Sequence, residues 1–327
     1  MQQRKLGADG PLVGAIALGC MSFGGAYGET DEAESHKTLA KALELGVTHL
    51  DTSNIYGTGR AEEMLGSFLK GKKGSFRIAT KAGIKAGPPR SFDNDPAYLR
   101  ECLEGSLRRL GLDHVDLFYI HRRDQSIPIE DVVGTLVRFK EEGKIGGIGF
   151  SEISPASLER AAAVHPVMAV QNEYSLWTRL PELGLIQACA RLGAALVAFS
   201  PLGRGMFADV VPDPARFHEK DFRRRNPRFM EPNFGFNKEK VARFNAYAQG
   251  RGHSPSSLAL AWVLARAPHI IPIPGTRSPE HLEQDVAGAA IALTPKDMDE
   301  IEAILPAGFA HGARYSDQQN IGQEGYG

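Results

Sequence analysis

Short apolar runs alternate with longer amphipathic segments along the chain. Eight runs rich in valine, isoleucine and alanine have the length of buried strands, at residues 15–18, 47–50, 77–80, 115–120, 145–150, 169–171, 195–199 and 270–273. The segments between them place apolar residues at helical spacing, as at Leu99, Leu103 and Leu107. This strict alternation implies parallel strands with right-handed crossovers, and eight such units favour a closed (β/α)8 TIM barrel.

Capping residues mark the beginnings of several helices. Ser154, Ser254 and Ser278 each stand directly before a proline, and Asp31 stands before an early amphipathic segment. A polar side chain at the N-cap and a proline at the first helical position are physical start signals. We therefore expect a helix to begin at each of these four positions.

Three segments fall outside the alternating pattern. Residues 4–14 are expected to form a β-hairpin that caps the bottom of the barrel. Residues 204–235, after the seventh strand, are rich in proline, phenylalanine and arginine, and so long a loop in a compact domain is usually functional. Residues 306–327 are rich in glycine and glutamine and are expected to lie over the surface. Residues 1–327 are therefore interpreted as one barrel domain.

A doubly wound Rossmann sheet is the competing architecture. Its glycine fingerprint is matched best by GRGMFA at residues 203–208, which follows a predicted strand. The next residues, DVVPDP, do not form the helix that this fingerprint requires, and a lone match is weak. The barrel is favoured.

Composition narrows the function classes. The 327 residues carry a formal net charge of -1, so there is no overall basic field to attract nucleic acid. Cys20, Cys102 and Cys189 lack CxxC spacing and nearby paired histidines, so no metal site is expected. The sequence holds no run of about 18 apolar residues that could span a membrane, and its first residues lack the apolar core of a signal peptide. A cytoplasmic location is expected.

Ionisable residues end three consecutive predicted strands. Asp51, Lys81 and His121 follow the second, third and fourth strands, and Tyr56 follows Asp51 in a glycine-rich loop. Because the carboxyl ends of barrel strands converge on one mouth, we expect these side chains to meet there. A purely structural ion pair between Asp51 and Lys81 is the alternative explanation.

These four side chains can together deliver a proton. A free phenol has a pKa near 10, but a nearby ammonium stabilises phenolate and lowers that pKa. With Lys81 held by Asp51, Tyr56 can protonate a carbonyl oxygen that His121 orients by a hydrogen bond. The set contains no activated serine or cysteine, so a proton transfer coupled to hydride transfer from a cofactor is the natural reaction.

The same residues resemble the signatures of the aldo-keto reductase superfamily. GVTHLDTSNIYGTGRAEEMLG is similar to its first signature, IATK to its lysine strand and VDLFYIHRRD to its histidine strand. GKIGGIGFSE, VQNEYSLW, AFSPLGRG and IPIPGT follow in family order, so the resemblance spans roughly residues 12–290. The HRR run, EYSLW and the Pro-Gly-Thr ending resemble the branch of bacterial and plant aldo-keto reductases, pyridoxal reductases and potassium-channel β subunits.

The resemblance implies a catalytic tetrad and a bound NADP(H). The tetrad would be Asp51, Tyr56, Lys81 and His121, with the cofactor extended across the barrel mouth. The cofactor-binding residues would be Met21, Ser151, Gln171, Tyr174, Ser200, Pro201, Leu202, Gly203, Arg204, Gly205, Gly275, Thr276, Arg277, His281, Gln284 and Asp285.

Each part of the implied cofactor has its own group of residues. Ser151 and Gln171 would bind the nicotinamide carboxamide, and Tyr174 would stack on the ring or pack close by. The small residues at 200–205 would let backbone amides approach the pyrophosphate. Residues 275–277 would hold the adenosine 2′-phosphate at a helix start, which favours NADP(H) over NAD(H).

Three positions depart from the family pattern. Glu152 stands where Asn is frequent, and its carboxylate either accepts a hydrogen bond from the carboxamide or points away. Asp285 stands where an Asn often touches the adenine amino group. Many relatives have an arginine for the 2′-phosphate near His281, so Arg277 must do more of this binding here.

Aromatic and basic residues near the strand ends are candidates for substrate contact. Tyr27, Arg122 and Trp177 are assigned this role, although Arg122 could equally be tied to a carboxylate and Trp177 could equally pack on the barrel. The arginine-rich residues 222–229 are either a solvated surface or a segment in which one arginine folds over the cofactor phosphates and gates release.

The implied function is NADPH-dependent reduction of aldehydes or ketones to alcohols, with hydride from nicotinamide C4 and a proton from Tyr56. An NADPH-binding redox-sensing regulatory subunit is the alternative from another class, because channel β subunits keep the tetrad. An oxidative sugar or alcohol dehydrogenase is the third hypothesis. The expected partner is a small carbonyl substrate, and the sequence leaves its identity and the oligomeric state open.

Overall fold

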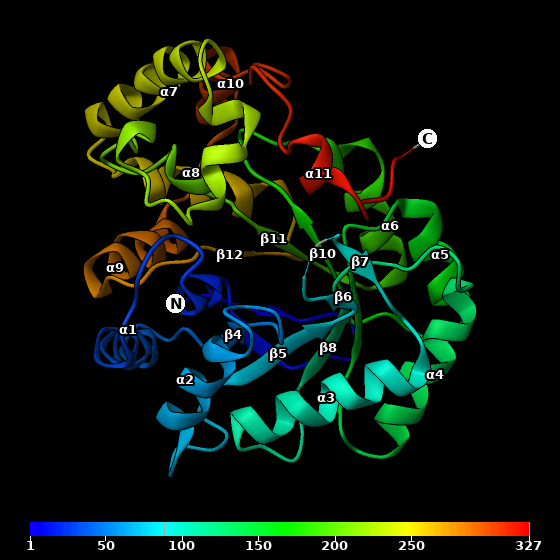
Figure 1. Ribbon diagram of the computed structural model, residues 1–327. Coiled ribbons are helices and arrows are strands. Elements are labelled where there is room, and N and C mark those ends of the chain that lie inside the picture. Colours follow the sequence, from blue (N-terminus) through cyan, green and yellow to red (C-terminus); the bar gives the residue numbers. More distant parts are fainter. Residues whose placement is uncertain (88, 327) are drawn as a thin grey trace.

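Eight parallel strands form the centre of the structure. The computed structural model describes residues 1–87 and 89–326. In chain order and in sheet order the strands are β3 (Leu18–Gly19), β4 (His49–Asp51), β5 (Arg77–Ala82), β8 (Leu117–Ile120), β9 (Ile148–Ser151), β10 (Ala169–Glu173), β11 (Ala195–Phe199) and β12 (Ile270–Ile273). Backbone N–H groups of Ala17 and Gly19 donate to the carbonyl oxygens of Pro272 and Pro274, so the sheet curves into a nearly closed barrel (Figure 1). The predicted (β/α)8 fold and its eight strands are confirmed.

Helices cover the outer face of this sheet (Figure 1). They are α1 (Glu32–Glu44), α2 (Arg60–Leu69), α3 (Pro96–Leu110), α4 (Ile129–Glu141), α5 (Pro155–Val164), α6 (Leu185–Leu192), α7 (Asn233–Gly250), α8 (Pro255–Arg266), α9 (Pro279–Ala287), α10 (Pro295–Ile304) and α11 (Asp317–Asn320). The side chains of Asp31, Ser154, Ser254 and Ser278 accept backbone N–H groups at the starts of α1, α5, α8 and α9, as predicted. No described helix is both long and apolar enough to cross a membrane.

A hairpin closes the amino end of the barrel. Strand β1 (Gln3–Lys5) pairs with β2 (Leu12–Gly14) in antiparallel register, as the sequence predicts. Leu6 and Val13 are fully buried against Leu117, Val197 and Ile271 from the barrel strands. Because each such buried side chain contributes about 1.5–3 kcal/mol, this end of the barrel is a packed core, and only the carboxyl end is open for chemistry.

Two irregular elements stand at the open end. The predicted loop, residues 204–235, is built from short 3-10 turns: η3 (Gly203–Gly205), η4 (Pro214–Arg216), η5 (Phe222–Arg225) and η6 (Pro227–Phe229). Its last residues already belong to α7. A small antiparallel sheet of β6 (Ile84–Lys85) and β7 (Ser91–Phe92) follows β5.

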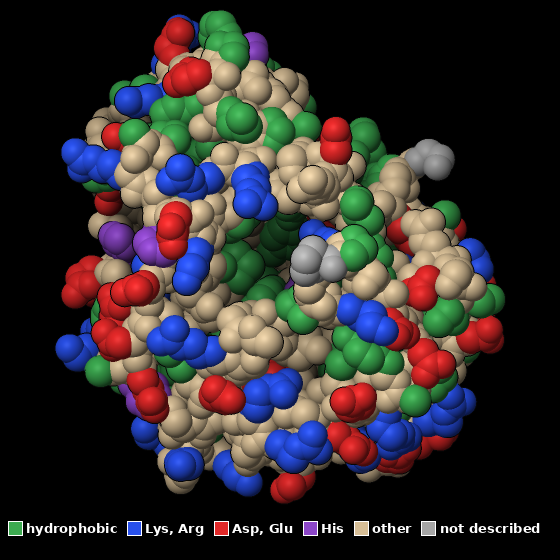
Figure 2. Space-filling model, in the orientation of Figure 1, with side chains coloured by type: hydrophobic (Ala, Val, Ile, Leu, Met, Phe, Trp, Pro, Cys, Tyr) green, Lys and Arg blue, Asp and Glu red, His purple; other side chains and the backbone are tan. Residues whose placement is uncertain are grey.

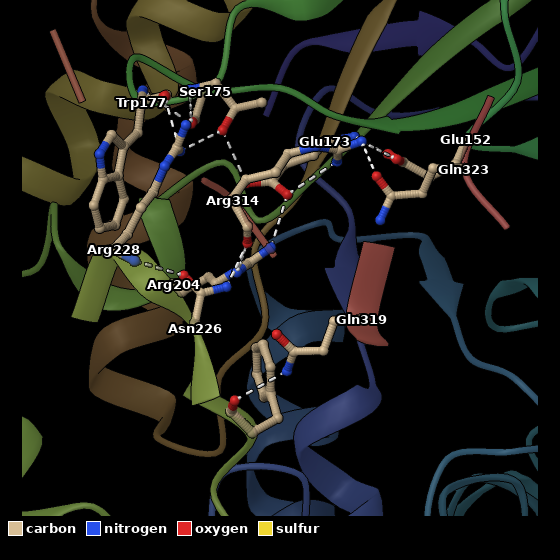
Figure 3. A network of polar contacts seen from close by, with 12 residues as sticks. Glu152, Glu173, Ser175, Trp177, Arg204, Asn226, Arg228, Arg314, Gln319 and Gln323 are labelled. Carbon is tan, nitrogen blue, oxygen red and sulfur yellow. Dashed lines mark hydrogen bonds and ion pairs between the residues drawn. The ribbon is translucent and has the colours of Figure 1, made fainter. Parts of the chain in front are cut away.

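The C-terminal tail, residues 306–327, is tied to the barrel mouth and does more than lie over the surface. Arg314 forms ion pairs with Glu152 and Glu173, and Figure 3 shows its side chain reaching between them. Glu324 pairs with Arg123 at 3.2 Å, and both side chains are buried. Buried ion pairs of this kind make the tail part of the folded unit.

Candidate active site

A cavity of about 1050 Å³ opens at the carboxyl ends of the strands. Figure 2 shows the hollow, with apolar side chains on its floor and basic side chains around its rim. Most predicted site residues line it: Met21, Tyr27, Asp51, Tyr56, His121, Arg122, Ser151, Gln171, Ser200, Pro201, Leu202, Arg204, Gly205, Gly275, Thr276, Arg277, His281, Gln284 and Asp285. The predicted residues outside this lining are Lys81, Tyr174, Trp177 and Gly203.

Lys81 lies directly behind the cavity wall. It is fully buried near the end of β5, next to β4, which ends in Asp51. Its Nζ donates to the Asp51 carboxylate, to the Thr52 carbonyl at 2.7 Å and to the Tyr56 hydroxyl at 3.5 Å. The barrel therefore places one ammonium group between a carboxylate and a phenol, as the sequence predicts.

The pKa of Tyr56 beside Lys81 differs from the sequence prediction, which expected it to be lowered. Burial raises the pKa of Tyr56, and the neighbouring Lys81 lowers it by less than burial raises it. Burial also disfavours the charge on Lys81, but Asp51 and Tyr56 outweigh this effect and raise the pKa of Lys81. Tyr56 is therefore protonated beside a fully charged ammonium, a group that favours a phenolate next to it.

His121 lines the cavity directly after β8, the strand that pairs with β5. Its ring lies edge-on to the Tyr56 ring with a centroid distance of 5.8 Å. Burial and the positive charges of Arg122, Lys81 and Arg90 hold the pKa of His121 well below its usual range, so the imidazole is neutral at pH 7. Its Nδ1 lies 3.0 Å from the buried Ser53 hydroxyl, a contact that sequence reasoning did not identify.

Gln171 and Ser151 lie beside the tetrad at the ends of their strands. The Nε2 group of Gln171 donates to Oδ2 of Asp51 at 2.7 Å, so Gln171 contacts both the cavity and the Asp51–Lys81 ion pair. The Ser151 hydroxyl accepts a hydrogen bond from Arg122 at 3.1 Å. Both side chains are polar groups at the base of the cavity, which fits recognition of an amide.

The far end of the cavity lies at the start of α9. Thr276 and Arg277 precede the N-cap Ser278, and helix N-termini attract anions. Gly19 and Gly275 line the cavity between this end and the tetrad, where a Cβ on Gly19 would lie 2.9 Å from the Ile273 carbonyl oxygen. The cavity thus forms a long groove with an amide site at one end and an anion site at the other, which fits an extended dinucleotide.

Comparison with known proteins assigns the family. The family model described as Aldo/keto reductase family matches residues 15–306 of this chain. The chain belongs to the aldo/keto reductase family. It is therefore an oxidoreductase, and the family acts on small carbonyl substrates.

Three relatives of this aldo-keto reductase illustrate the similarity. "Probable aldo-keto reductase 1" of Glycine max is 38% identical over 324 residues, covering 96% of this chain and 92% of the relative. "Aldo-keto reductase yakc [NADP(+)]" of Schizosaccharomyces pombe is 39% identical over 320 residues, covering 95% and 94%. The solved structure of glycerol dehydrogenase AKR11B4 from Gluconobacter oxydans superposes with a TM-score of 0.83 at 28% identity, covering 93% of this chain and 94% of that chain.

Two aromatic assignments made from the sequence of this aldo-keto reductase are wrong in the structure. Tyr174 lies outside the cavity, with its hydroxyl donating to Glu182 at 2.7 Å and its ring packed on Trp262 at 5.6 Å. Trp177 is also buried, with its ring against Phe229 at 5.5 Å. Tyr174 thus packs on α8 through Trp262, and Trp177 packs on the loop after β11, as the alternative for Trp177 expected; neither side chain lines the cavity.

Gly203 is a packing residue and not a lining residue. A Cβ at this position would lie 2.7 Å from the Trp177 ring, and the backbone φ is +57°, so glycine is required twice over. Gly205, two residues later, does line the cavity, with φ of +100°. Gly203 thus packs under the Trp177 ring, and Gly205 lines the groove.

Arg204, between these glycines, is held by a network of buried charges. Its Nη2 donates to Glu173 at 2.8 Å and its Nη1 to the Arg314 carbonyl at 2.7 Å. Figure 3 shows Arg204 and Arg314 converging on Glu173. Glu152 accepts from Arg314 and from the Glu173 backbone at 2.9 Å, so its carboxylate is directed into this network and away from a nicotinamide.

Several cavity residues of this aldo-keto reductase were not assigned from the sequence, among them Phe199, Asp209 and Tyr315, and the sequence left the role of the run that contains Arg223 open. Phe199 ends β11 and presents a flat ring beside Ser200. Arg223 lies within the arginine-rich segment, pairs with Asp221 at 2.6 Å and stacks on Phe217 at 4.1 Å, so it folds into the mouth. Tyr315 comes from the tail, and no local sequence signal points to its place in the cavity.

Proposed function

We propose that this enzyme reduces aldehydes or ketones to alcohols with NADPH. The observation that carries the proposal is the cluster at the cavity base, where Tyr56 lies beside the buried Lys81–Asp51 ion pair and edge-on to the neutral ring of His121. When bound, the reduced nicotinamide supplies the hydride for the carbonyl carbon.

The chain's own residues supply the proton and the orientation. Tyr56 donates its proton to the carbonyl oxygen as that oxygen gains negative charge, and Lys81 stabilises the resulting phenolate. His121 is neutral, so one ring nitrogen can donate a hydrogen bond to the same oxygen without a competing positive charge. Asp51 holds Lys81 in place and is itself held by Gln171 at 2.7 Å.

The groove supports the assignment of the cofactor residues. Ser151 and Gln171 would bind the carboxamide of the nicotinamide, and Phe199, in place of Tyr174, would offer a ring face to it. Residues 200–205 would face the pyrophosphate. Arg277 and the start of α9 would bind the adenosine 2′-phosphate, which agrees with the NADP(+) in the name of the fission-yeast relative.

One experiment tests this proposal directly. The decay of NADPH absorbance is followed against a panel of aldehydes, ketones, pyridoxal and sugars, with NADH in parallel. Turnover of several members with NADPH, and slower turnover with NADH, is the expected result. No turnover of any member would contradict the proposal and favour a regulatory role for NADPH binding.

The oxidative direction is a second candidate. It is supported by the structural similarity to a protein named glycerol dehydrogenase. Because the same tetrad can remove a proton from an alcohol, NADP(+) reduction with glycerol and other polyols would measure this activity. If kcat/KM for polyol oxidation with NADP(+) exceeds kcat/KM for carbonyl reduction with NADPH at neutral pH, the oxidative direction is favoured.

A further inference from the structure

Three cavity arginines, Arg90, Arg122 and Arg277, have only neutral partners among the described residues. Arg277 lies at the start of α9, whereas Arg90 and Arg122 lie away from that end of the cavity. Arg122 follows His121 at the end of β8, and Arg90 stands directly before β7; both line the cavity. The hydrogen bonds that their guanidinium groups form among the described residues all go to carbonyl or hydroxyl oxygens. By contrast, Arg204 and Arg223 each pair with a buried carboxylate, at 2.8 Å and 2.6 Å.

Arg122 is the more deeply buried of the two. Only 5% of its surface is exposed. Its Nη1 donates to the His121 carbonyl at 2.6 Å and to Ser151 at 3.1 Å, while its Nε is buried with no partner in the described part of the chain. Asn94 fixes its backbone by donating to the Arg122 carbonyl at 3.2 Å. A buried guanidinium without an anion is costly, so its charge calls for a ligand.

Arg90 adds a second positive charge close by. It is half-buried, and its Nη1 donates to the Gln319 carbonyl of the tail at 3.3 Å. Burial and the charge of Arg122 lower the pKa of Arg90, and both arginines lower the pKa of His121. The backbone places the two arginines on adjoining segments. A Cβ on Gly83, directly before β6, would lie 3.2 Å from the Arg122 carbonyl oxygen, and β6 pairs with β7, which directly follows Arg90. Arg122 in turn directly follows His121.

We propose that Arg90 and Arg122 bind an anionic group of the substrate, a carboxylate or a phosphate, beside the reacting carbonyl. This inference rests on the proposed reductase function. A guanidinium group matches both anions with two parallel N–H donors, and two such groups neutralise a carboxylate or a phosphate. The substrate class is therefore aldehydes or ketones that carry a carboxylate or phosphate.

The test compares matched neutral and anionic substrates. Butanal is paired with succinic semialdehyde, and glyceraldehyde with glyceraldehyde 3-phosphate, so that the two pairs separate a carboxylate from a phosphate. For at least one pair, kcat/KM for the anion should exceed that for the neutral compound at least about tenfold, and added salt should reduce the ratio.

Substitutions of the two arginines test whether they cause the preference for the anionic substrate. Arg90→Met and Arg122→Met should each bring the ratio to within about threefold of one. Lys85→Met is the matched control, because Lys85 also lines the cavity but already pairs with Asp93 at 2.9 Å, and it should keep the ratio of the wild type. Equal use of neutral and anionic substrates by the wild type, or a ratio that survives both arginine variants, would overturn the inference.

Binding of succinate alone gives a readout that needs no turnover. Isothermal titration should show succinate binding to the wild type and a loss of binding in the Arg90→Met variant. Failure of succinate and phosphate to bind would overturn the anion site even if neutral aldehydes are reduced. Absence of turnover of all four aldehydes, with succinate or phosphate bound, would instead contradict the reductase function and leave the site intact.

Discussion

The hydroxyl of Ser53 lies 3.0 Å from Nδ1 of His121, beneath the floor of the cavity. Ser53 is fully buried, and its one hydroxyl proton has two acceptors within reach, the Lys81 carbonyl at 3.3 Å and the closer Nδ1. When the hydroxyl donates to Nδ1, the single proton of the neutral imidazole stays on Nε2, which can then donate to a carbonyl oxygen. Ser53 is thus placed to select the tautomer that the proposed mechanism needs.

Replacing Ser53 by Ala should therefore slow the chemical step. We expect kcat to fall about tenfold, less than the roughly 10²–10⁴-fold loss for a proton-transfer group, because Ser53 acts only through His121, while the KM for NADPH changes little. Nitrogen-15 shifts of the His121 ring report the tautomer, and Ser53→Thr, which keeps the hydroxyl, should restore it. An Ala variant with wild-type kcat and an unchanged tautomer would contradict this role.

Asp285 makes stability depend on pH at the other end of the groove. Burial, together with the charge of Asp209, raises the pKa of Asp285 to about 8 from its ordinary value of 3.8. Between these two values the folded state binds one proton more than the unfolded state. The stability of the folded protein is therefore not reduced by Asp285 below pH 3.8, and it falls as the pH rises toward 8. Asp285→Asn should gain about 2–4 kcal/mol relative to the wild type between pH 5 and pH 8.

Thermal denaturation of both proteins across this pH range measures the effect. The difference in Tm between Asp285→Asn and the wild type should be small at pH 5 and grow as the pH rises. Parallel Tm curves for the two proteins would mean that Asp285 titrates normally in the folded state.

Arg314 connects the tail to two buried carboxylates. Glu152 and Glu173 are 2% and 4% exposed. Removing Arg314 leaves the buried charge of Glu152 without a cation among the described residues, whereas Glu173 keeps Arg204. We expect Arg314→Met to lower the free energy of unfolding by about 3–5 kcal/mol in urea titrations. Arg225→Met, at an exposed position, is the control and should change it by less than about 0.5 kcal/mol. Equal effects of the two substitutions would show that the network adds no stability.

Arg277 should control the choice of cofactor. It is half-buried beside the start of α9, and its guanidinium donates to the Glu29 carbonyl. Arg277→Met should raise the KM for NADPH about tenfold, the loss expected for one charge-assisted hydrogen bond, and leave the KM for NADH nearly unchanged. A parallel rise for both cofactors would place the 2′-phosphate elsewhere.

Sequence reasoning found the residues that end strands. Asp51, Lys81 and His121 were identifiable because each directly follows or ends an apolar run, and the barrel brings all strand ends to one mouth. The same logic places Ser151 and Gln171. Family, fold and tetrad all follow from local patterns of this kind.

The aromatic residues were misassigned because the alternation of strand side chains was not followed. Along β11, Ala195 and Val197 point into the barrel, so Phe199 continues the inward series and reaches the cavity. Along β10, Val170 faces the helices, and Tyr174, four residues later, faces the same way. A count of alternate positions would have selected Phe199 and rejected Tyr174.

The role of the tail could not be read from sequence at all. Arg314 pairs with Glu173 although 141 residues separate them, and Tyr315 reaches the cavity from beyond the last strand. Neither contact leaves a periodic pattern, because both depend on the path of an irregular segment after the barrel is complete.

Tyr56→Phe tests the central claim most directly. The variant is mixed with NADPH and an aldehyde that the wild type reduces, and NADPH consumption is followed in a single turnover beside a fluorescence titration of NADPH binding. Tyr174→Phe, which removes a hydroxyl outside the cavity, is the matched control. The account predicts that Tyr56→Phe loses about 10²–10⁴-fold in rate, that NADPH affinity stays within about twofold, and that the control retains its rate. A Tyr56→Phe variant that consumes NADPH at the wild-type rate would contradict the account.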